Sequence, residues 1–145
     1  KAKAFGATHT INSSEVDPVK AVLEITGGRG ADAVFDFVGI ASVTLQALEM
    51  TTDGGGLYLI GVLDPTAVME LSSLQLLMKK RRIEGVYMGS TNPKRDIPLF
   101  AKLYLEGRFE LDALVSKEIR LDQIDEGYAA LADPTIARVV VTDLG

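Results

Sequence analysis

Three short strand-like segments, each with a glycine where it stops, constrain the fold of this chain more than any other feature. Residues 33–38 and 57–62 are nearly continuous apolar runs, which is typical of strands buried on both faces of a sheet, and residues 82–88 predict a third strand. Helical patterns lie between them, at about residues 42–50 and at residues 72–78. Strands that alternate with helices predict an α/β fold with a parallel sheet and right-handed crossover connections.

Capping residues and turn signals mark the remaining elements. Side chains that accept a hydrogen bond from a backbone N–H are expected to begin four helices, at Asp17, at Ser72 or Ser73, at Asp96 and at Asp122. Residues 53–56 predict a turn, and extended segments are expected at residues 8–11, 112–120 and 137–142. The last helix is expected to turn three side chains inward, those of Ile124, Tyr128 and Leu131.

Composition excludes several classes of protein. The 145 residues include 0 Cys and 1 His, which excludes a disulfide scaffold, a thiolate zinc site and a multi-histidine metal cage within this sequence. A net charge of -5 argues against a nucleic-acid partner, and no apolar run approaches the ~20 residues that span a membrane. Residues 1–5, followed by Gly6, are typical of the last turn of a helix, so we expect the sequence to be a fragment.

Glycines at the ends of the three apolar strands suggest where a ligand would bind. In open parallel sheets, ligands bind beyond the carboxyl ends of the strands, where Gly39, Gly61 and Gly89 lie in this sequence. A missing side chain lets a flat ring or a phosphate approach the backbone. A single glycine is more often only a turn residue, but three in register favour a binding edge.

The order of these segments resembles the medium-chain, zinc-type alcohol dehydrogenases. Residues 30–39, 55–62 and 82–90 are similar to the fourth, fifth and sixth sheet strands of that family, and residues 95–98, 121–128 and 137–141 to its closing segments. The resemblance implies an α/β fold: a partial, doubly wound, Rossmann-type parallel sheet lacking its first two strands, plus a small α+β C-terminal segment. Residues 1–89 would be an incomplete dinucleotide-binding domain, and residues 90–145 a segment returning to the catalytic domain.

The resemblance also implies a bound nicotinamide cofactor, NAD or NADP. Phe37, Val38 and Gly39 would contact its adenosine side, and Ile60, Gly61 and Val62 would lie against the nicotinamide. Backbone groups of Ile60, Val86 and Met88 would bond the carboxamide of the nicotinamide. Arg138 would contact the pyrophosphate. A surface arginine at a strand end is the alternative interpretation of Arg138. The sequence holds no G-x-G-x-x-G motif, so the phosphate-binding glycine loop would precede residue 1.

The implied parent enzyme is an oxidoreductase that transfers a hydride between an alcohol or aldehyde and NAD(P). Its zinc would lie in an N-terminal domain outside this sequence, with no metal and no catalytic residue in this segment, which alone is expected to be inactive. We expect a cytoplasmic homo-oligomer with a small-molecule substrate and no membrane or nucleic-acid partner. Two alternatives stay open: a zinc-free quinone or enoyl reductase of the same superfamily, and a non-catalytic nucleotide-binding or oligomerisation module.

The missing strands would leave an unpaired sheet edge. We expect this edge either to pair with another chain or to be covered by residues 8–11 moving beside residues 33–38.

Several polar residues have both a structural and a functional interpretation. Asp36, inside an apolar strand, is expected to bond backbone amides or a hydroxyl rather than to act as an acid or base. His9 is expected at an exposed strand edge. The basic run at residues 79–82 either contacts phosphate or opposes the negative end of a helix dipole. The acidic side chains of Asp122, Asp125 and Glu126 are expected to belong to a helix's first turn rather than to a metal site.

Overall fold

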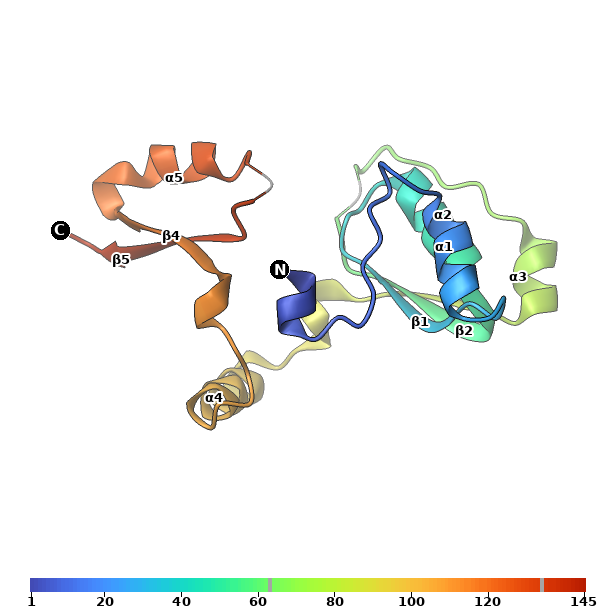
Figure 1. The fold of residues 1–145 in the computed structure, drawn as a ribbon, viewed down its shortest axis with the longest axis horizontal. Coiled ribbons are helices and arrows are strands. Elements are labelled where there is room, and N and C mark those ends of the chain that lie inside the picture. The colour runs from blue at the N-terminus through green and yellow to red at the C-terminus, as the bar shows by residue number, and fades with distance from the viewer. Residues whose placement is uncertain (63, 134) are drawn as a thin grey trace. The chain divides into compact units, whose positions relative to one another are not determined.

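A computed structural model describes residues 1–62, 64–133 and 135–145 of the chain, which forms two compact units (Figure 1). The first unit comprises residues 1–91 and the second residues 92–145. The assignment of these units to parts of a dinucleotide-binding and a catalytic domain, with a boundary at residue 89, stays a prediction. Among the described residues, no helix has the length and apolar character needed to cross a bilayer.

The first unit is built on the predicted parallel sheet. Its strands are β1 (Ala31–Asp36), β2 (Thr51–Leu59) and β3 (Arg82–Gly85), and they pair side by side in that order. Helix α2 (Ala41–Met50) connects β1 to β2, and α3 (Ser73–Lys79) lies between β2 and β3 in sequence. The α/β class with parallel strands is therefore confirmed.

Local capping chemistry explains where two of these helices begin. The carboxylate of Asp17 accepts hydrogen bonds from two N–H groups at the start of α1 (Pro18–Ile25), at 3.0 and 3.2 Å. Ser72 accepts one from the N–H of Gln75 at the start of α3. The chain begins with a short 3-10 helix, Ala2–Phe5, which ends at Gly6 with φ +96°, so the expected last helical turn is also confirmed.

Two predicted elements of the first unit are wrong. Residues 8–11 are not a strand, and β1 pairs with β2 alone in the described part of the chain. A β-branched run becomes a strand only beside a partner, and none lies next to this one, so His9 is exposed in an irregular segment. Residues 53–56 form no separate turn but lie inside β2. The pairing of β1 with β2 changes register there, because Ala31 is opposite Thr51 whereas Ala33 is opposite Gly56.

Two strands also end earlier than the apolar runs predict. β2 ends at Leu59 rather than residue 62, and β3 ends at Gly85 rather than residue 88. A 3-10 turn, Tyr87–Ser90, follows β3. Apolar runs mark strands but do not resolve their ends, because the residues just beyond a parallel strand can be equally apolar.

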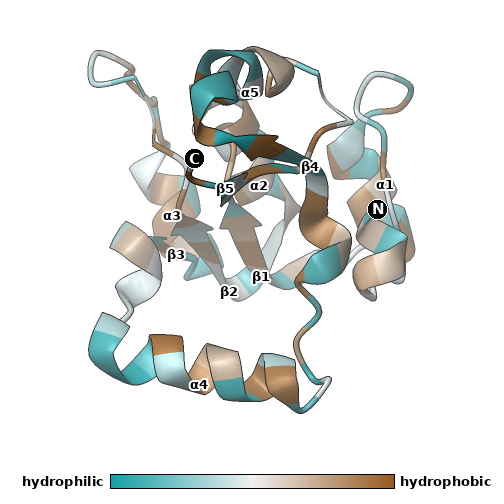
Figure 2. Ribbon diagram, turned by 90° about the vertical axis from the view of Figure 1, so that its left-hand side faces the viewer, coloured by the Kyte–Doolittle hydropathy of each residue, from teal (hydrophilic) through white to brown (hydrophobic). Residues whose placement is uncertain are grey.

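Among the described residues, the sheet of the first unit is covered on one face only, which corrects the prediction of strands buried on both faces. Right-handed crossovers between successive neighbouring strands place their helices on the same side, and α2 and α3 both line one cavity beside the sheet. The opposite face carries Phe35, which is 59% exposed and stacks on Tyr58 of β2 with ring centroids 5.0 Å apart. In Figure 2, much of β1 and β2 has the brown colour of hydrophobic residues.

The second unit contains another parallel pair joined by a helix. Its elements are α4 (Pro93–Leu105), a 3-10 turn (Asp112–Leu114), β4 (Val115–Arg120), a second 3-10 turn (Leu121–Gln123), α5 (Ile124–Ala130) and β5 (Arg138–Asp143). Gly127 allows α5 to lie close to the sheet, since a Cβ there would be 2.6 Å from Cδ1 of the buried Ile119. None of the three side chains predicted to turn inward is buried, since Ile124 is 37%, Leu131 49% and Tyr128 71% exposed.

Neither Asp96 nor Asp122 is the helix cap that the sequence suggests. Helix α4 begins earlier, with Asn92 at its N-cap and Pro93 at its first position, a position that proline favours. Asp96 lies in the first turn and accepts a hydrogen bond from the N–H of Asn92 at 2.7 Å. Asp122 instead pairs with Arg120 at 3.1 Å.

Candidate functional site

The carboxyl ends of β1, β2 and β3 form one continuous edge held by backbone hydrogen bonds. The carbonyl of Asp36 accepts from the N–H groups of Ile60 and Gly61, at 2.9 and 2.8 Å. The carbonyl of Leu59 accepts from the N–H of Val86 at 2.8 Å. The strand ends that the sequence singled out are therefore neighbours, and their order along the edge follows the order of the strands.

Gly39 and Gly61 lie directly against each other at this edge. A Cβ at Gly61 would be 2.8 Å from the carbonyl oxygen of Phe37, and a Cβ at Gly39 would be 2.6 Å from that of Val62. Gly39 also has φ +71°, a left-handed conformation that disfavours other residues. Both glycines are thus required by the contact of two strand ends, whatever else approaches them.

The Asp36 side chain fixes the turn between β1 and α2. It is 4% exposed, and its Oδ1 accepts from the N–H groups of Val38 and Gly39, at 2.8 and 3.3 Å. Its Oδ2 accepts from the hydroxyl of Thr44 at 2.5 Å. Burial alone would raise the pKa of Asp36, but these hydrogen bonds to the charged form hold it below its usual value. The prediction that Asp36 bonds amides and a hydroxyl is confirmed.

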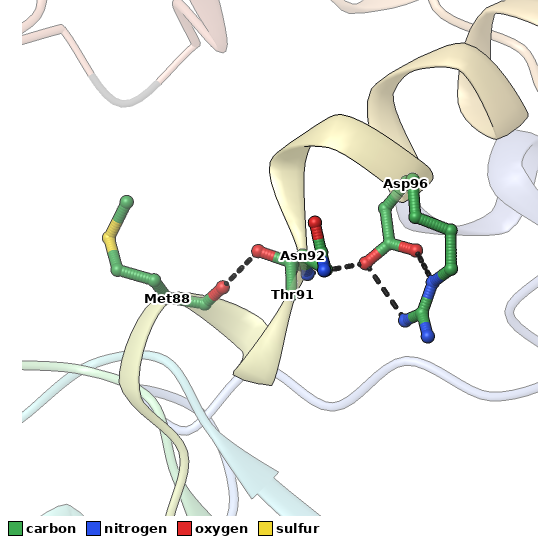
Figure 3. A network of polar contacts seen from close by, with 5 residues as sticks. Met88, Thr91, Asn92 and Asp96 are labelled. Carbon is green, nitrogen blue, oxygen red and sulfur yellow. Dashed lines mark hydrogen bonds and ion pairs between the residues drawn. The ribbon is translucent and has the colours of Figure 1, made fainter.

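The segment after β3 has an unusual backbone. Met88, Gly89 and Ser90 have φ of +50°, +67° and +52° in succession, and non-glycine residues in this region are strained by about 1–3 kcal/mol each. The carbonyl of Met88 accepts from the hydroxyl of Thr91 at 2.8 Å and from its N–H at 3.4 Å (Figure 3). Gly89 is not crowded, since a Cβ there would meet only Thr91 Cγ2 at 3.4 Å.

Exposed apolar side chains extend beyond the strand ends. Val62 is 91% exposed, and large apolar side chains follow all three strands. These exposed side chains are Phe37, Val38, Ile40, Val62, Tyr87 and Met88. The edge therefore offers apolar contact area beside a rim of backbone polar groups, which is the composition of sites that bind flat, partly polar ligands.

Two further residues singled out by the sequence belong to neither the strands nor the turns of this edge. Arg138 is the exposed first residue of β5 in the second unit, in register with Val115. His9 makes a hydrogen bond with the hydroxyl of Thr8 at 3.0 Å. In residues 1–62, 64–133 and 135–145, no three His, Cys, Asp or Glu side chains gather as a metal site would require.

Sequence reasoning did not identify Thr44 as the partner of Asp36. Thr44 lies in the first turn of α2 and is 2% exposed. The sequence contained one signal for this contact. A threonine lies early in a helix that follows an apolar strand with an aspartate at its end.

Comparison with known proteins assigns the fold and the family. A family model described as "Zinc-binding dehydrogenase" matches residues 1–106. The chain is 34% identical over 140 residues to putative alcohol dehydrogenase D of Mycobacterium tuberculosis, covering 94% of this chain and 38% of the relative. It is 33% identical over 144 residues to an NDMA-dependent alcohol dehydrogenase of Amycolatopsis methanolica, covering 97% of this chain and 38% of the relative.

Solved structures agree with these relatives. Benzyl alcohol dehydrogenase from Acinetobacter calcoaceticus superposes with a TM-score of 0.92 at 29% identity, covering 99% of this chain and 39% of that one. An alcohol dehydrogenase zinc-binding domain protein from Burkholderia ambifaria gives a TM-score of 0.89 at 33% identity, covering 97% of this chain and 38% of that one. The chain thus spans well under half the length of its relatives, and its sheet corresponds to part of a Rossmann-type domain. With a parallel sheet of this topology and a match to the family model over most of its length, the chain belongs to the zinc-binding dehydrogenase family.

Proposed function

We propose that this chain is the cofactor-orienting part of an NAD(P)-dependent alcohol dehydrogenase. The observation that carries the proposal is the shared carboxyl edge of β1, β2 and β3, where backbone bonds from Asp36 and Leu59 hold three strand ends together. Ligands of open parallel sheets bind at such an edge. The relatives named above are alcohol dehydrogenases, which favours oxidation of a small alcohol, or reduction of an aldehyde, over quinone or enoyl reduction.

The residues at this edge suit a nicotinamide nucleotide. Phe37, Val38 and Gly39 would contact its adenosine side, and Ile60, Gly61 and Val62 would lie against the nicotinamide. The Met88 carbonyl already accepts two hydrogen bonds from Thr91, so we assign the carboxamide contact at Met88 to its N–H, beside backbone groups of Ile60 and Val86. Arg138 would pair with the pyrophosphate through its planar guanidinium.

In this proposal the chain supplies orientation and not bond-making groups. When bound, the nicotinamide supplies the carbon that accepts or returns the hydride. Asp36 holds the β1–α2 turn, the paired glycines keep two strand ends in contact, and the exposed apolar side chains exclude water from one ring face. Zinc is assigned to a part of the parent enzyme outside this sequence.

Titration of the isotope-labelled 145-residue chain with NAD+ tests the proposal. We expect weak binding, with a dissociation constant on the order of millimolar, because the phosphate-binding glycine loop lies outside this sequence. The backbone amide signals of Gly39, Gly61 and Met88 should shift together with one binding curve. Shifts confined to residues away from the carboxyl edge, or submicromolar affinity, would contradict it.

A further inference from the structure

The opposite, amino-terminal edge of the sheet carries a buried arginine without a full set of partners. Arg81 directly precedes β3, and its side chain is 10% exposed. Within the described part of the chain, no atom accepts a hydrogen bond from its buried Nε–H, and its ion partner is Asp53 at 3.8 Å. A guanidinium stays charged inside a protein, so an unmatched buried donor is costly.

A cavity of about 400 Å³ opens beside this guanidinium. Its polar lining comes from the starts of the three strands and from the ends of α2 and α3. The lining residues are Arg29, Glu49, Thr52, Asp53, Lys79 and Arg81. Because the strands are parallel, the residues before them meet at one edge, away from the carboxyl edge proposed for the cofactor.

The charge pattern at this edge exceeds what a helix end requires. Lys79, Lys80, Arg81 and Arg82 form an unbroken basic run that begins at the last residue of α3, a helix of only seven residues. Opposing the helix dipole accounts for the exposed Lys79 and Lys80, because a helix end carries about half a charge. It does not account for a guanidinium that is buried beside a cavity. Of the nearby acids, Glu49 and Asp53 line the cavity but are exposed, Asp53 to 74%, and Asp32 is already paired with Arg29 at 2.7 Å.

We propose that this cavity binds a doubly charged oxyanion of the phosphate type, with Arg81 as its principal donor. The two Nη groups of the Arg81 guanidinium offer a planar pair of N–H donors that matches two oxygens of a phosphate. Lys79 contributes a second cation from the exposed side of the cavity, and Arg29 a third that is shared with Asp32. The bound group is either free phosphate or the phosphoryl group of a small metabolite.

Titration of the isotope-labelled full chain with inorganic phosphate tests this site, with sodium chloride at equal ionic strength as the reference. We expect saturable shifts of the amide signals of Thr52 and Arg81 with phosphate, and none with chloride. Arg81→Gln should weaken binding about tenfold or more, and Arg81→Lys, which keeps the charge but loses the planar pair of donors, by nearly as much. Arg82→Gln is the matched control, because the same charge is lost from an exposed neighbour that does not line the cavity.

A second variant covers the case in which Arg81 variants fail to fold. Lys79→Gln changes an exposed residue of the cavity and should weaken phosphate binding by about threefold. Equal losses in Lys79→Gln and Arg82→Gln, or identical shifts with chloride and phosphate, would overturn the site. Phenyl phosphate and acetate, used as further titrants, distinguish a phosphoryl group on an organic molecule from free phosphate and from a simple carboxylate. Tighter binding of acetate than of phosphate would also overturn the proposed site. NAD+ at the carboxyl edge should not displace phosphate, so this test and that of the cofactor edge succeed or fail separately.

Discussion

The hydroxyl of Thr44 donates a 2.5 Å hydrogen bond to Oδ2 of Asp36, joining the first turn of α2 to the last residue of β1. The other carboxylate oxygen accepts from two N–H groups of the intervening turn. The backbone carbonyl of the same aspartate accepts from the end of β2. One residue therefore organises two of the three strand ends that form the carboxyl edge.

Replacing Asp36 tests this role through stability and its pH dependence. Asp36→Asn should lower the free energy of unfolding by about 1.5–3 kcal/mol at neutral pH, because hydrogen bonds to a charged group are lost. The folded-state pKa of Asp36 lies below the ordinary value of 3.8, so the carboxylate's contribution is fully present above pH 3.8 and is lost as the pH falls through the lower, folded-state pKa. Urea unfolding across this range should give a flatter pH profile for Asp36→Asn than for the natural sequence.

The matched control is Glu24→Gln, which removes a carboxylate from the exposed face of α1. It should leave both the stability at neutral pH and the shape of the acid profile unchanged. A profile for Asp36→Asn that runs parallel to the natural one would show that this carboxylate is not the titrating group.

Gly61 and Gly85 form a pair of substitutions with opposite expectations. In Gly61→Ala the new methyl group would collide with the backbone of Phe37 and Gly39, so we expect a loss of about 1–3 kcal/mol. In Gly85→Ala nothing lies within 4 Å of the added Cβ, and the smaller entropy of the unfolded chain should leave stability equal or slightly raised. Urea midpoints of the two variants decide the matter, and equal midpoints would refute the close packing of the two strand ends.

Met88 stores backbone strain that glycine would relieve. At φ +50°, Met88→Gly should raise the free energy of unfolding by about 0.5–1 kcal/mol, since the relief of strain exceeds the added flexibility of the unfolded chain. Met78→Gly, an exposed methionine inside α3, should instead lower it by about 1 kcal/mol. Thermal unfolding followed by circular dichroism measures both, and a loss in Met88→Gly would mean that its left-handed conformation is not strained.

The open edge of β1 leads us to expect self-association of the chain. Only β2 pairs with β1 in the described residues, and Phe35 is exposed on the uncovered face. Sedimentation velocity should detect an oligomer that grows with concentration, and Phe35→Lys should shift it towards the monomer, because a charged side chain on an edge strand discourages pairing. Phe5→Lys, outside the sheet, is the control. A natural chain that remains monomeric at high concentration would refute this expectation.

Sequence signals were reliable where neighbouring residues settle the outcome. The caps at Asp17 and Ser72 depend on backbone groups two or three residues away, and both form as predicted. The strands β1 and β2 followed from short apolar runs, since such runs are typical of parallel strands. The hydrogen-bonding role of Asp36 followed in the same way, from the cost of burying a bare carboxylate.

Sequence signals failed where a distant partner decides the outcome. Residues 8–11 have strand-forming side chains but no strand beside them, and propensity alone does not form a ladder. Asp96 and Asp122 have the right chemistry for capping, but Asn92 and Gln123 occupy the cap positions. The contact of Gly39 with Gly61 and the burial of Arg81 arise from elements farther apart in sequence, and no periodicity encodes them.

Every described pair of parallel strands lies within one unit, and so does the segment that connects its two strands. The pairs are β1 with β2, β2 with β3, and β4 with β5. No described ladder crosses the junction between Thr91 and Asn92. A protease that nicked the chain at that junction would therefore sever no sheet hydrogen bond. Each of the two products would keep the pairing of its own strands.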